Sequence, residues 1–105
     1  MRLSRLFIFI LAAVVMLGMS KFSVAQEAAD LYKTKCASCH GADGKGDTAV
    51  GKKLAVRDFH APEVAKETDD ELFDITKKGK NKMPGYDGKL TDDQIKALVK
   101  FIKSL

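Results

Sequence analysis

The C-terminal segment carries an amphipathic pattern that predicts a helix. Apolar side chains recur there at intervals of three and four residues, which places them on one face of a helix. They are Ile95, Leu98, Val99 and Ile102, and Phe101 widens the face. Thr91 and Gln94 form a capping box ahead of this face. We therefore predict that the helix starts at Thr91.

A second capping box, formed by Thr68 and Glu71, marks a helix in the middle of the chain. Its apolar side consists of Leu72, Phe73 and Ile75. Gly79 is well placed to end this helix in a left-handed conformation. A third helix is predicted from about Glu27 to Cys39, a stretch without Gly or Pro.

The segments between these helices are rich in turn-forming residues. Four glycines occur within Gly41 to Gly51, which predicts a loop. Pro62 favours the start of a short helical turn. The stretch from Lys80 to Tyr86 contains Pro and Gly and also predicts a loop. No alternating strand pattern is present, so we predict an all-α domain. Its loops are too long for three helices alone, which indicates that they wrap around a bound group.

The first 25 residues have the composition of a secretory signal peptide. Arg2 and Arg5 give a basic start, and an apolar run of 14 residues follows from Leu6 to Met19. Small residues in Ser23-Val24-Ala25 predict cleavage after Ala25, which leaves a domain at residues 26–105. The alternative is an uncleaved membrane anchor, although a spanning helix needs about 20 apolar residues.

Charge excludes one class of function once the leader is set aside. The chain has 18 basic and 14 acidic residues, and the leader holds three of the basic ones. The remaining 80 residues therefore have a net charge of +1. A nucleic-acid-binding domain would keep a strong basic excess, so we expect no nucleic-acid partner.

The segment Cys36-Ala37-Ser38-Cys39-His40 carries the most specific signal in the chain. C-x-x-C-H in an exported protein is typical of covalent haem attachment. Cysteines three apart lie on the same face of a helix and can both form thioethers with one haem edge. The adjacent His40 supplies an imidazole to the iron. A zinc site would require four ligands, and after residue 25 only His60 could be added to the motif. A thioredoxin-like site would require a βαβ unit, and the sequence shows no strand pattern.

The second axial ligand is predicted to be Met83. It is the only methionine after residue 25, and it lies in the loop before Pro84. Pro84 favours an extended backbone at Met83 and stiffens the loop. His60 is the rival ligand, with a solvated loop histidine as its simpler interpretation. Four lysines precede or flank Met83, and they form either an ordinary solvated face or a positive rim that steers an acidic redox partner. They are Lys77, Lys78, Lys80 and Lys82.

The sequence resembles the short bacterial class I cytochromes c over essentially the whole of residues 26–105. The resemblance rests on Cys36-x-x-Cys39-His40-Gly41, Gly44, Gly46, Asp58-Phe59, Gly79, Met83-Pro84 and the C-terminal helix. It implies the class I cytochrome c fold, in which the N- and C-terminal helices cross and the loops wrap around one covalent haem c. It implies thioethers at Cys36 and Cys39 and axial ligation by His40 and Met83.

The resemblance also implies specific packing and one departure from the family pattern. Ala28 and Tyr32 are expected to meet Leu98 and Phe101 where the terminal helices cross. Lys52 stands where many relatives have a proline whose carbonyl accepts the proximal histidine's N–H. Because any residue has a carbonyl, we expect Lys52 to be able to accept that hydrogen bond from His40.

These inferences predict an exported, most simply periplasmic, monomeric electron carrier rather than an enzyme. It would shuttle single electrons between larger redox complexes, such as a membrane oxidoreductase, an oxidase or a dehydrogenase. A dihaem peroxidase would need a second attachment motif, which the sequence lacks. The alternative function is a haem-based ligand binder or sensor whose sixth coordination site is open.

Overall fold

The computed structural model describes residues 5, 7–9 and 23–105, and most of the predicted signal peptide lies outside these residues. The helices are α2 (Val24–Lys35), α3 (Ala37–His40), α4 (Ala49–Leu54), α5 (Pro62–Ala65), α6 (Asp69–Lys78) and α7 (Asp92–Ser104). The described part contains two isolated β-bridges and no strand, which confirms the predicted all-α class. None of the helices described has the length and apolar character that a bilayer span requires.

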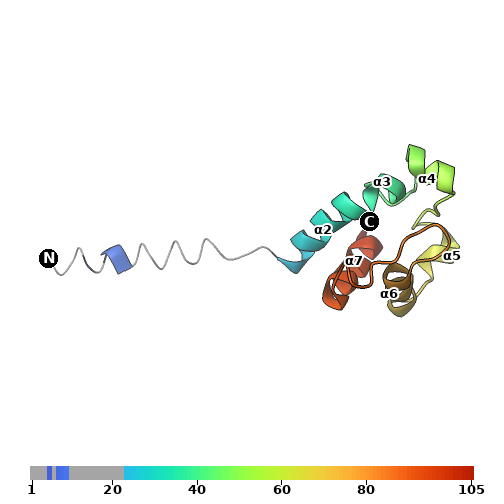
Figure 1. Ribbon diagram of the computed structural model, residues 1–105. Helices are drawn as coiled ribbons and strands as arrows, with labels where there is room; N and C mark the ends of the chain where they lie inside the picture. The colour runs from blue at the N-terminus through green and yellow to red at the C-terminus, as the bar shows by residue number, and fades with distance from the viewer. Residues whose placement is uncertain (1–4, 6, 10–22) are drawn as a thin grey trace.

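Helices α2 and α7 pack against each other, although they come from opposite ends of the domain (Figure 1). Tyr32 of α2 and Leu98 of α7 belong to one core cluster and are almost completely buried. The Tyr32 and Phe101 rings lie with their centroids 5.1 Å apart and their planes inclined by 49°. Ala28 is also buried. This packing agrees with the crossing that the family resemblance implies, and α6 covers another side of α7.

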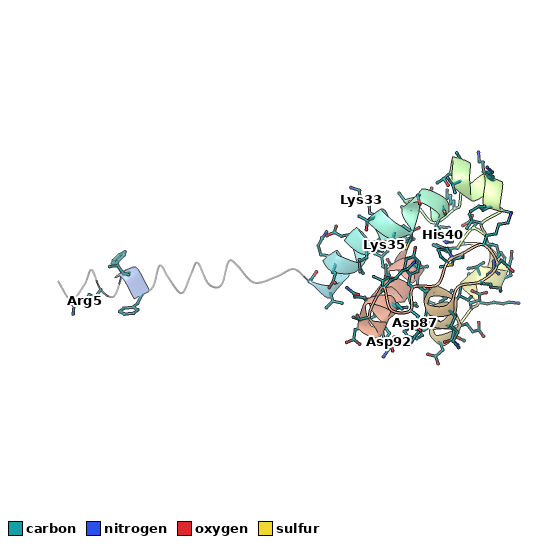
Figure 2. The ribbon with its side chains drawn as sticks, viewed as in Figure 1. Arg5, Lys33, Lys35, His40, Asp87 and Asp92 are labelled. Atoms are coloured by element: carbon teal, nitrogen blue, oxygen red, sulfur yellow. The ribbon has the colours of Figure 1, made fainter. Side chains whose placement is uncertain are left out.

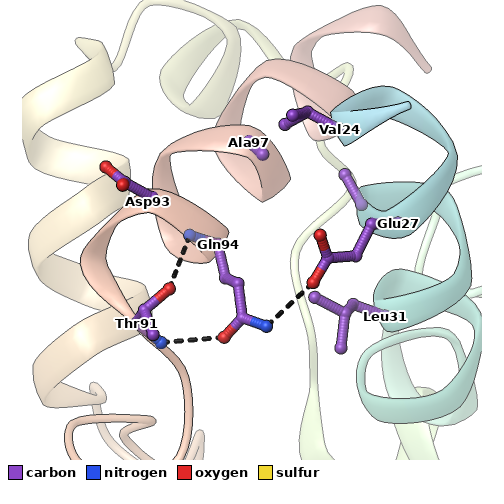
Figure 3. A pocket seen from close by; sticks show the side chains of 8 residues that line it. Val24, Glu27, Leu31, Thr91, Asp93, Gln94 and Ala97 are labelled. Carbon is purple, nitrogen blue, oxygen red and sulfur yellow. Dashed lines mark hydrogen bonds between the residues drawn. The ribbon is translucent and has the colours of Figure 1, made fainter. Parts of the chain in front are cut away.

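The beginnings of α2 and α7 are joined by the predicted capping box at Thr91. The Gln94 N–H donates to Thr91 Oγ1 at 3.1 Å, and the Thr91 N–H donates to Gln94 Oε1 at 2.9 Å. Gln94 Nε2 also donates to Glu27 Oε1 at 2.9 Å, as Figure 3 shows. A cavity of about 250 Å³ lies beside this link and includes none of the predicted haem ligands.

The second capping box begins α6 as predicted, and Gly79 follows the end of the helix as predicted. The Glu71 N–H donates to Thr68 Oγ1 at 3.1 Å, and the Thr68 N–H donates to Glu71 Oε2 at 3.2 Å. Gly79 follows α6 with φ 80° and ψ 167°, so its φ is positive but its ψ is extended. The predicted left-handed φ at Gly79 is therefore confirmed, whereas its ψ lies outside the left-handed helical region. The extended ψ sends the chain directly into the Met83 loop.

Two boundaries differ from the sequence-based expectations. The first helix is interrupted at Cys36, where φ is −119°, so α2 and α3 are separate. A short helix, α4, begins within the stretch predicted as a loop. Thr48 caps α4 by accepting the Gly51 N–H at 2.9 Å. Because Gly51 lies inside this helix and disfavours it, local composition concealed the helix. The helical turn predicted at Pro62 is present as α5.

Candidate haem site

Cys36 stands at the break between α2 and α3 and Cys39 lies within α3, and both are half-buried free thiols. Burial raises the pKa of Cys36 to about 11, against a smaller lowering by Lys35. A redox-active C-x-x-C pair needs a cysteine whose pKa is lowered, so that a thiolate forms near neutral pH. The environment of Cys36 therefore argues against thioredoxin-like chemistry and is compatible with thiols that become covalent anchors.

His40 ends α3 and is half-buried, on the side of α3 that faces α5 and α6 (Figure 2). Burial lowers the pKa of the imidazole, which keeps the ring neutral near pH 7. Neutral imidazole is the form that binds iron. The ring stacks on Phe59, with centroids 4.6 Å apart and planes inclined by 24°. His40 therefore has the protonation state that ligation requires.

The expected hydrogen bond from His40 to the Lys52 carbonyl is absent. The His40 Nδ1 atom is buried and has no hydrogen-bond partner among the described residues. Lys52 lies in α4, and its carbonyl accepts the Ala55 N–H at 3.3 Å. The sequence-based expectation is wrong because the stretch is helical, so the Lys52 carbonyl points along the helix toward Ala55.

The close approach of α4 to α3 depends on Gly51. A Cβ atom at Gly51 would lie 2.3 Å from the Cys39 carbonyl oxygen and 2.6 Å from the Gly46 carbonyl oxygen. Both distances are shorter than van der Waals contact allows, and both atoms belong to the backbone. Only glycine fits at this position, which brings α4 directly against the backbone of the attachment motif.

Met83 lies half-buried in a tight turn after α6. The Met83 N–H donates to the Lys80 carbonyl at 2.9 Å, and the Lys80 N–H donates to the Met83 carbonyl at 3.2 Å. Farther along, the Tyr86 N–H donates to the carbonyls of Thr76 at 3.1 Å and Lys77 at 3.0 Å. The loop is thus fastened to the C-terminal end of α6, which fixes the backbone that presents the Met83 sulfur.

Gly85 allows this loop to pack against the end of α6. A Cβ atom at Gly85 would lie 2.7 Å from the Lys78 carbonyl oxygen and 2.8 Å from that of Lys77. The neighbouring Gly79 is similarly crowded by the Met83 carbonyl oxygen, at 2.7 Å. Two glycines are therefore needed to close the Met83 loop.

His60, the rival ligand, uses both ring nitrogens at the surface. Nδ1 lies 2.7 Å from Asp58 Oδ1, and Nε2 lies 3.0 Å from the backbone oxygen of Leu105. These contacts raise the pKa of His60, chiefly through the side-chain hydrogen bond with Asp58. This arrangement corresponds to the solvated loop histidine that the sequence favoured.

The apolar groups of the domain suit a large apolar cofactor. The main buried cluster consists of only Tyr32, Leu90, Ile95 and Leu98. Many other apolar side chains remain half-buried, among them Phe59, Phe73 and Ile102. A small domain buries a modest share of its surface on its own. Together with the two cysteine thiols, the neutral His40 imidazole and the Met83 sulfur, these side chains fit a covalently attached haem.

The four lysines of the predicted rim have unequal surroundings. Lys77 Nζ lies 3.0 Å from Asp92 Oδ1, which raises the pKa of Lys77. Lys78 Nζ lies 4.0 Å from Asp74 Oδ1. Lys80 and Lys82 are exposed beside Met83, and neither forms an ion pair within residues 23–105. Lys80 and Lys82 are therefore the lysines best placed to meet another molecule.

Two residues that hold the attachment motif were missed at the level of sequence. The Tyr32 hydroxyl donates to the Gly41 carbonyl at 2.6 Å, although the sequence indicated only a packing role for Tyr32. Thr48 Oγ1 donates to the carbonyls of Ser38 at 2.9 Å and Cys39 at 3.0 Å. A threonine three residues before Gly51 has the spacing of a helix cap, which was the available signal for Thr48.

Comparison with known proteins identifies the family. The family model described as "Cytochrome C oxidase, cbb3-type, subunit III" matches residues 23–102. The chain belongs to this cytochrome c family. A solved structure of the KustC0563 c-type cytochrome has a similar fold, with a TM-score of 0.68 and 32% sequence identity. The similarity covers 73% of this chain and 94% of that one. Comparison with curated proteins gives no match.

Family membership confirms several of the sequence-based expectations. The protein is a monohaem c-type cytochrome with an all-α class I fold, and its cofactor is one covalent haem c. Its general activity is haem-based electron transport. The haem supplies one-electron oxidation and reduction of its iron, while the protein supplies attachment, axial ligands and docking surfaces.

Proposed function

We propose that this cytochrome shuttles single electrons between larger redox complexes through a haem with His40 and Met83 as axial ligands. Cys36 and Cys39 form the two thioethers. The observation that carries the proposal is the placement of Met83. Its turn is closed by two hydrogen bonds with Lys80 and fastened to the end of α6. A ligand held in this way moves little when the iron changes oxidation state, which suits a carrier more than a sensor.

The visible spectrum of the oxidised and reduced protein tests covalent haem and methionine ligation together. A second test adds carbon monoxide to the reduced protein. We expect little binding by the wild type and ready binding by Met83→Ala, because the substitution removes the sixth ligand. His60→Gln is the control and is expected to behave like the wild type. Ready binding by the wild type would favour an open sixth site and a ligand-binding function.

We propose that residues 1–25 form a cleaved export signal and that residues 26–105 act outside the cytoplasm, most simply in the periplasm. The basic start and the apolar run of 14 residues support this proposal. N-terminal sequencing of the isolated protein tests it. A chain that starts at Gln26 is the expected result, whereas a chain that keeps the leader would indicate a membrane anchor.

We propose that the electron partner is an acidic surface of a larger redox complex, such as an oxidase, and that catalysis is left to that complex. The family description names an oxidase subunit, which supports this class of partner. Lys80 and Lys82 flank Met83 and are exposed, whereas Lys77 is paired with Asp92. The rate of electron transfer with a purified oxidase should fall at high ionic strength. It should also fall in Lys80→Gln and Lys82→Gln more than in Lys77→Gln.

A further inference from the structure

Each backbone carbonyl from Ala37 to Gly41, at the C-terminal end of the attachment motif, accepts a hydrogen bond. A helix normally leaves its last four carbonyls without intrahelical partners. In α3 the Ala37 carbonyl accepts the Gly41 N–H at 2.8 Å, and the His40 carbonyl accepts the Gly46 N–H at 2.8 Å. The carbonyls of Ser38 and Cys39 instead accept hydrogen bonds from a side-chain hydroxyl, and the Gly41 carbonyl accepts one from a hydroxyl in addition to the Gly44 N–H at 3.2 Å.

Thr48 holds the side of the motif that precedes His40. Its hydroxyl lies 2.9 Å from the Ser38 carbonyl and 3.0 Å from the Cys39 carbonyl. The same oxygen accepts the Gly51 N–H at 2.9 Å, which anchors Thr48 to the start of α4. One side chain therefore joins α4 to the two carbonyls before His40.

Tyr32 holds the side of the motif that follows His40. Its hydroxyl donates to the Gly41 carbonyl at 2.6 Å, and the side chain is 2% exposed. Burial raises the pKa of Tyr32 to about 12, so the hydroxyl remains a donor over the working pH range. The ring also packs on Phe101. Tyr32 thus connects the crossing of α2 and α7 to the residue next to His40.

The His40 ring lacks the support that usually orients a metal-binding histidine. Such a histidine generally donates its second N–H to a carbonyl, a carboxylate or water, which fixes the ring direction. The Nδ1 atom of His40 is buried without a partner among the described residues. The ring touches Phe59, but stacking restrains rotation within the ring plane weakly. The direction of the imidazole therefore depends on the backbone that carries it.

We propose that Tyr32 and Thr48 are positioning residues, whose hydroxyls fix the direction of the His40 imidazole by holding the carbonyls on either side of it. The inference rests on the proposed role of His40 as an iron ligand. It assigns Tyr32 and Thr48 a role that apolar packing and helix capping do not require. The phenylalanine and valine side chains have nearly the same shapes but lack the donors.

The test uses the haem-loaded protein with Tyr32→Phe, Thr48→Val and the double substitution. In the oxidised state, NMR shifts of the His40 ring and β protons report the angle of the imidazole to the iron. We expect these resonances to move in each variant, and to move most in the double variant. We also expect the Gly41 and Gly46 amides to exchange with solvent about tenfold faster, because loss of the hydroxyl bonds loosens the backbone segment that carries both amides.

Three further variants separate positioning from general stability. Thr48→Ser keeps the hydroxyl and should restore wild-type His40 resonances. Thr48→Asp keeps an acceptor for the Gly51 N–H but has no donor at neutral pH, so its His40 resonances should move as in Thr48→Val. Thr34→Val removes a hydroxyl that bonds only within α2, to the Asp30 and Leu31 carbonyls, and should leave His40 unchanged.

The outcomes distinguish this inference from the proposed function. Unchanged His40 resonances in Tyr32→Phe and Thr48→Val would overturn the positioning role, even if both variants unfold more easily. Failure of Thr48→Ser to restore the resonances would also count against it. If the wild-type spectrum lacks histidine ligation, the proposed function fails first, and that result is visible before any variant is made.

Discussion

The Phe59 ring stacks on the imidazole of His40, with the ring centroids 4.6 Å apart. Phe59 is tied to the loop after His40, because its N–H donates to the Gly44 carbonyl at 2.9 Å. We predict that Phe59→Leu lowers the free energy of unfolding by about 1 kcal/mol, since aromatic contact is lost while apolar volume is largely kept. Denaturant titration measures this change.

The same variant should broaden the His40 ring resonances, because the imidazole loses a flat neighbour. Phe73→Leu is the matched control, since Phe73 is also half-buried but its ring does not stack on His40. Equal broadening in the two variants would show that Phe59 has no particular influence on His40.

Gly51→Ala should be strongly destabilising. The added methyl group would meet the carbonyl oxygens of Cys39 and Gly46 at distances that neither backbone segment can accept. We expect a loss of about 2–3 kcal/mol in the free energy of unfolding, typical of overpacking. Thermal unfolding with calorimetry measures the change.

Gly88→Ala is the control for this substitution. Gly88 has φ +76° and nothing within 4 Å of an added Cβ, so its cost comes from backbone conformation alone. That cost should be about 1 kcal/mol. A loss in Gly51→Ala no larger than in Gly88→Ala would contradict the close approach of α4 to the attachment motif.

Gly85→Ala should displace the Met83 loop from the end of α6. The added Cβ would meet the Lys78 carbonyl oxygen at 2.7 Å, so the loop must shift to accommodate it. We expect the reduced protein to bind carbon monoxide more readily than the wild type. The spectrum under carbon monoxide provides the measurement, and Gly88→Ala again serves as the control. Wild-type resistance to carbon monoxide in Gly85→Ala would argue against Met83 as the sixth ligand.

The pair formed by His60 and Asp58 predicts a dependence of stability on pH. Hydrogen bonding to Asp58 and to the Leu105 backbone raises the pKa of His60 above its ordinary 6.5. The stabilising contribution of His60 is therefore complete below pH 6.5 and is lost as pH rises through the raised folded pKa. Desolvation and, to a smaller extent, Lys45 oppose the shift.

Asp58 acts in the opposite direction at acid pH. Its hydrogen bonds from the His60 backbone and side chain lower its pKa below 3.8, so its contribution is lost as pH falls through the folded value. The pair should stabilise the protein most between about pH 4 and 6.5. Unfolding free energies measured across this range and at higher pH should show a decline above pH 6.5 that His60→Gln removes. The same decline in His60→Gln would assign it to another group.

The elements with strong local signals were predictable from the sequence. The capping boxes at Thr68 and Thr91 are each formed by two residues only three positions apart in the sequence. Both helices begin directly after these threonines. The short helix α4 was not predictable, because its interior glycine is explained only by the nearby Cys39 carbonyl. Long-range contacts of this kind leave no periodic pattern.

The site shows the same division between local and long-range information. The motif from Cys36 to His40 and the lone Met83 are visible in the sequence because spacing and composition mark them. The hydroxyl contacts of Tyr32 and Thr48 with this motif are not visible, since each spans about nine residues and depends on tertiary packing. The missing hydrogen bond between His40 Nδ1 and the Lys52 carbonyl was likewise not predictable, because it results from the unpredicted helix α4.

The contact between Tyr32 and Phe101 has a consequence for the order of events during biosynthesis. A chain emerges from its N-terminus, so Cys36 and Cys39 appear well before α7 is complete. Until then Tyr32 lacks the partners on α7 that bury it. We expect the two thiols to stay accessible to the attachment machinery during this interval. Packing of α7 would then complete the fold, and the folded cytochrome would restrict access to its own haem-attachment site.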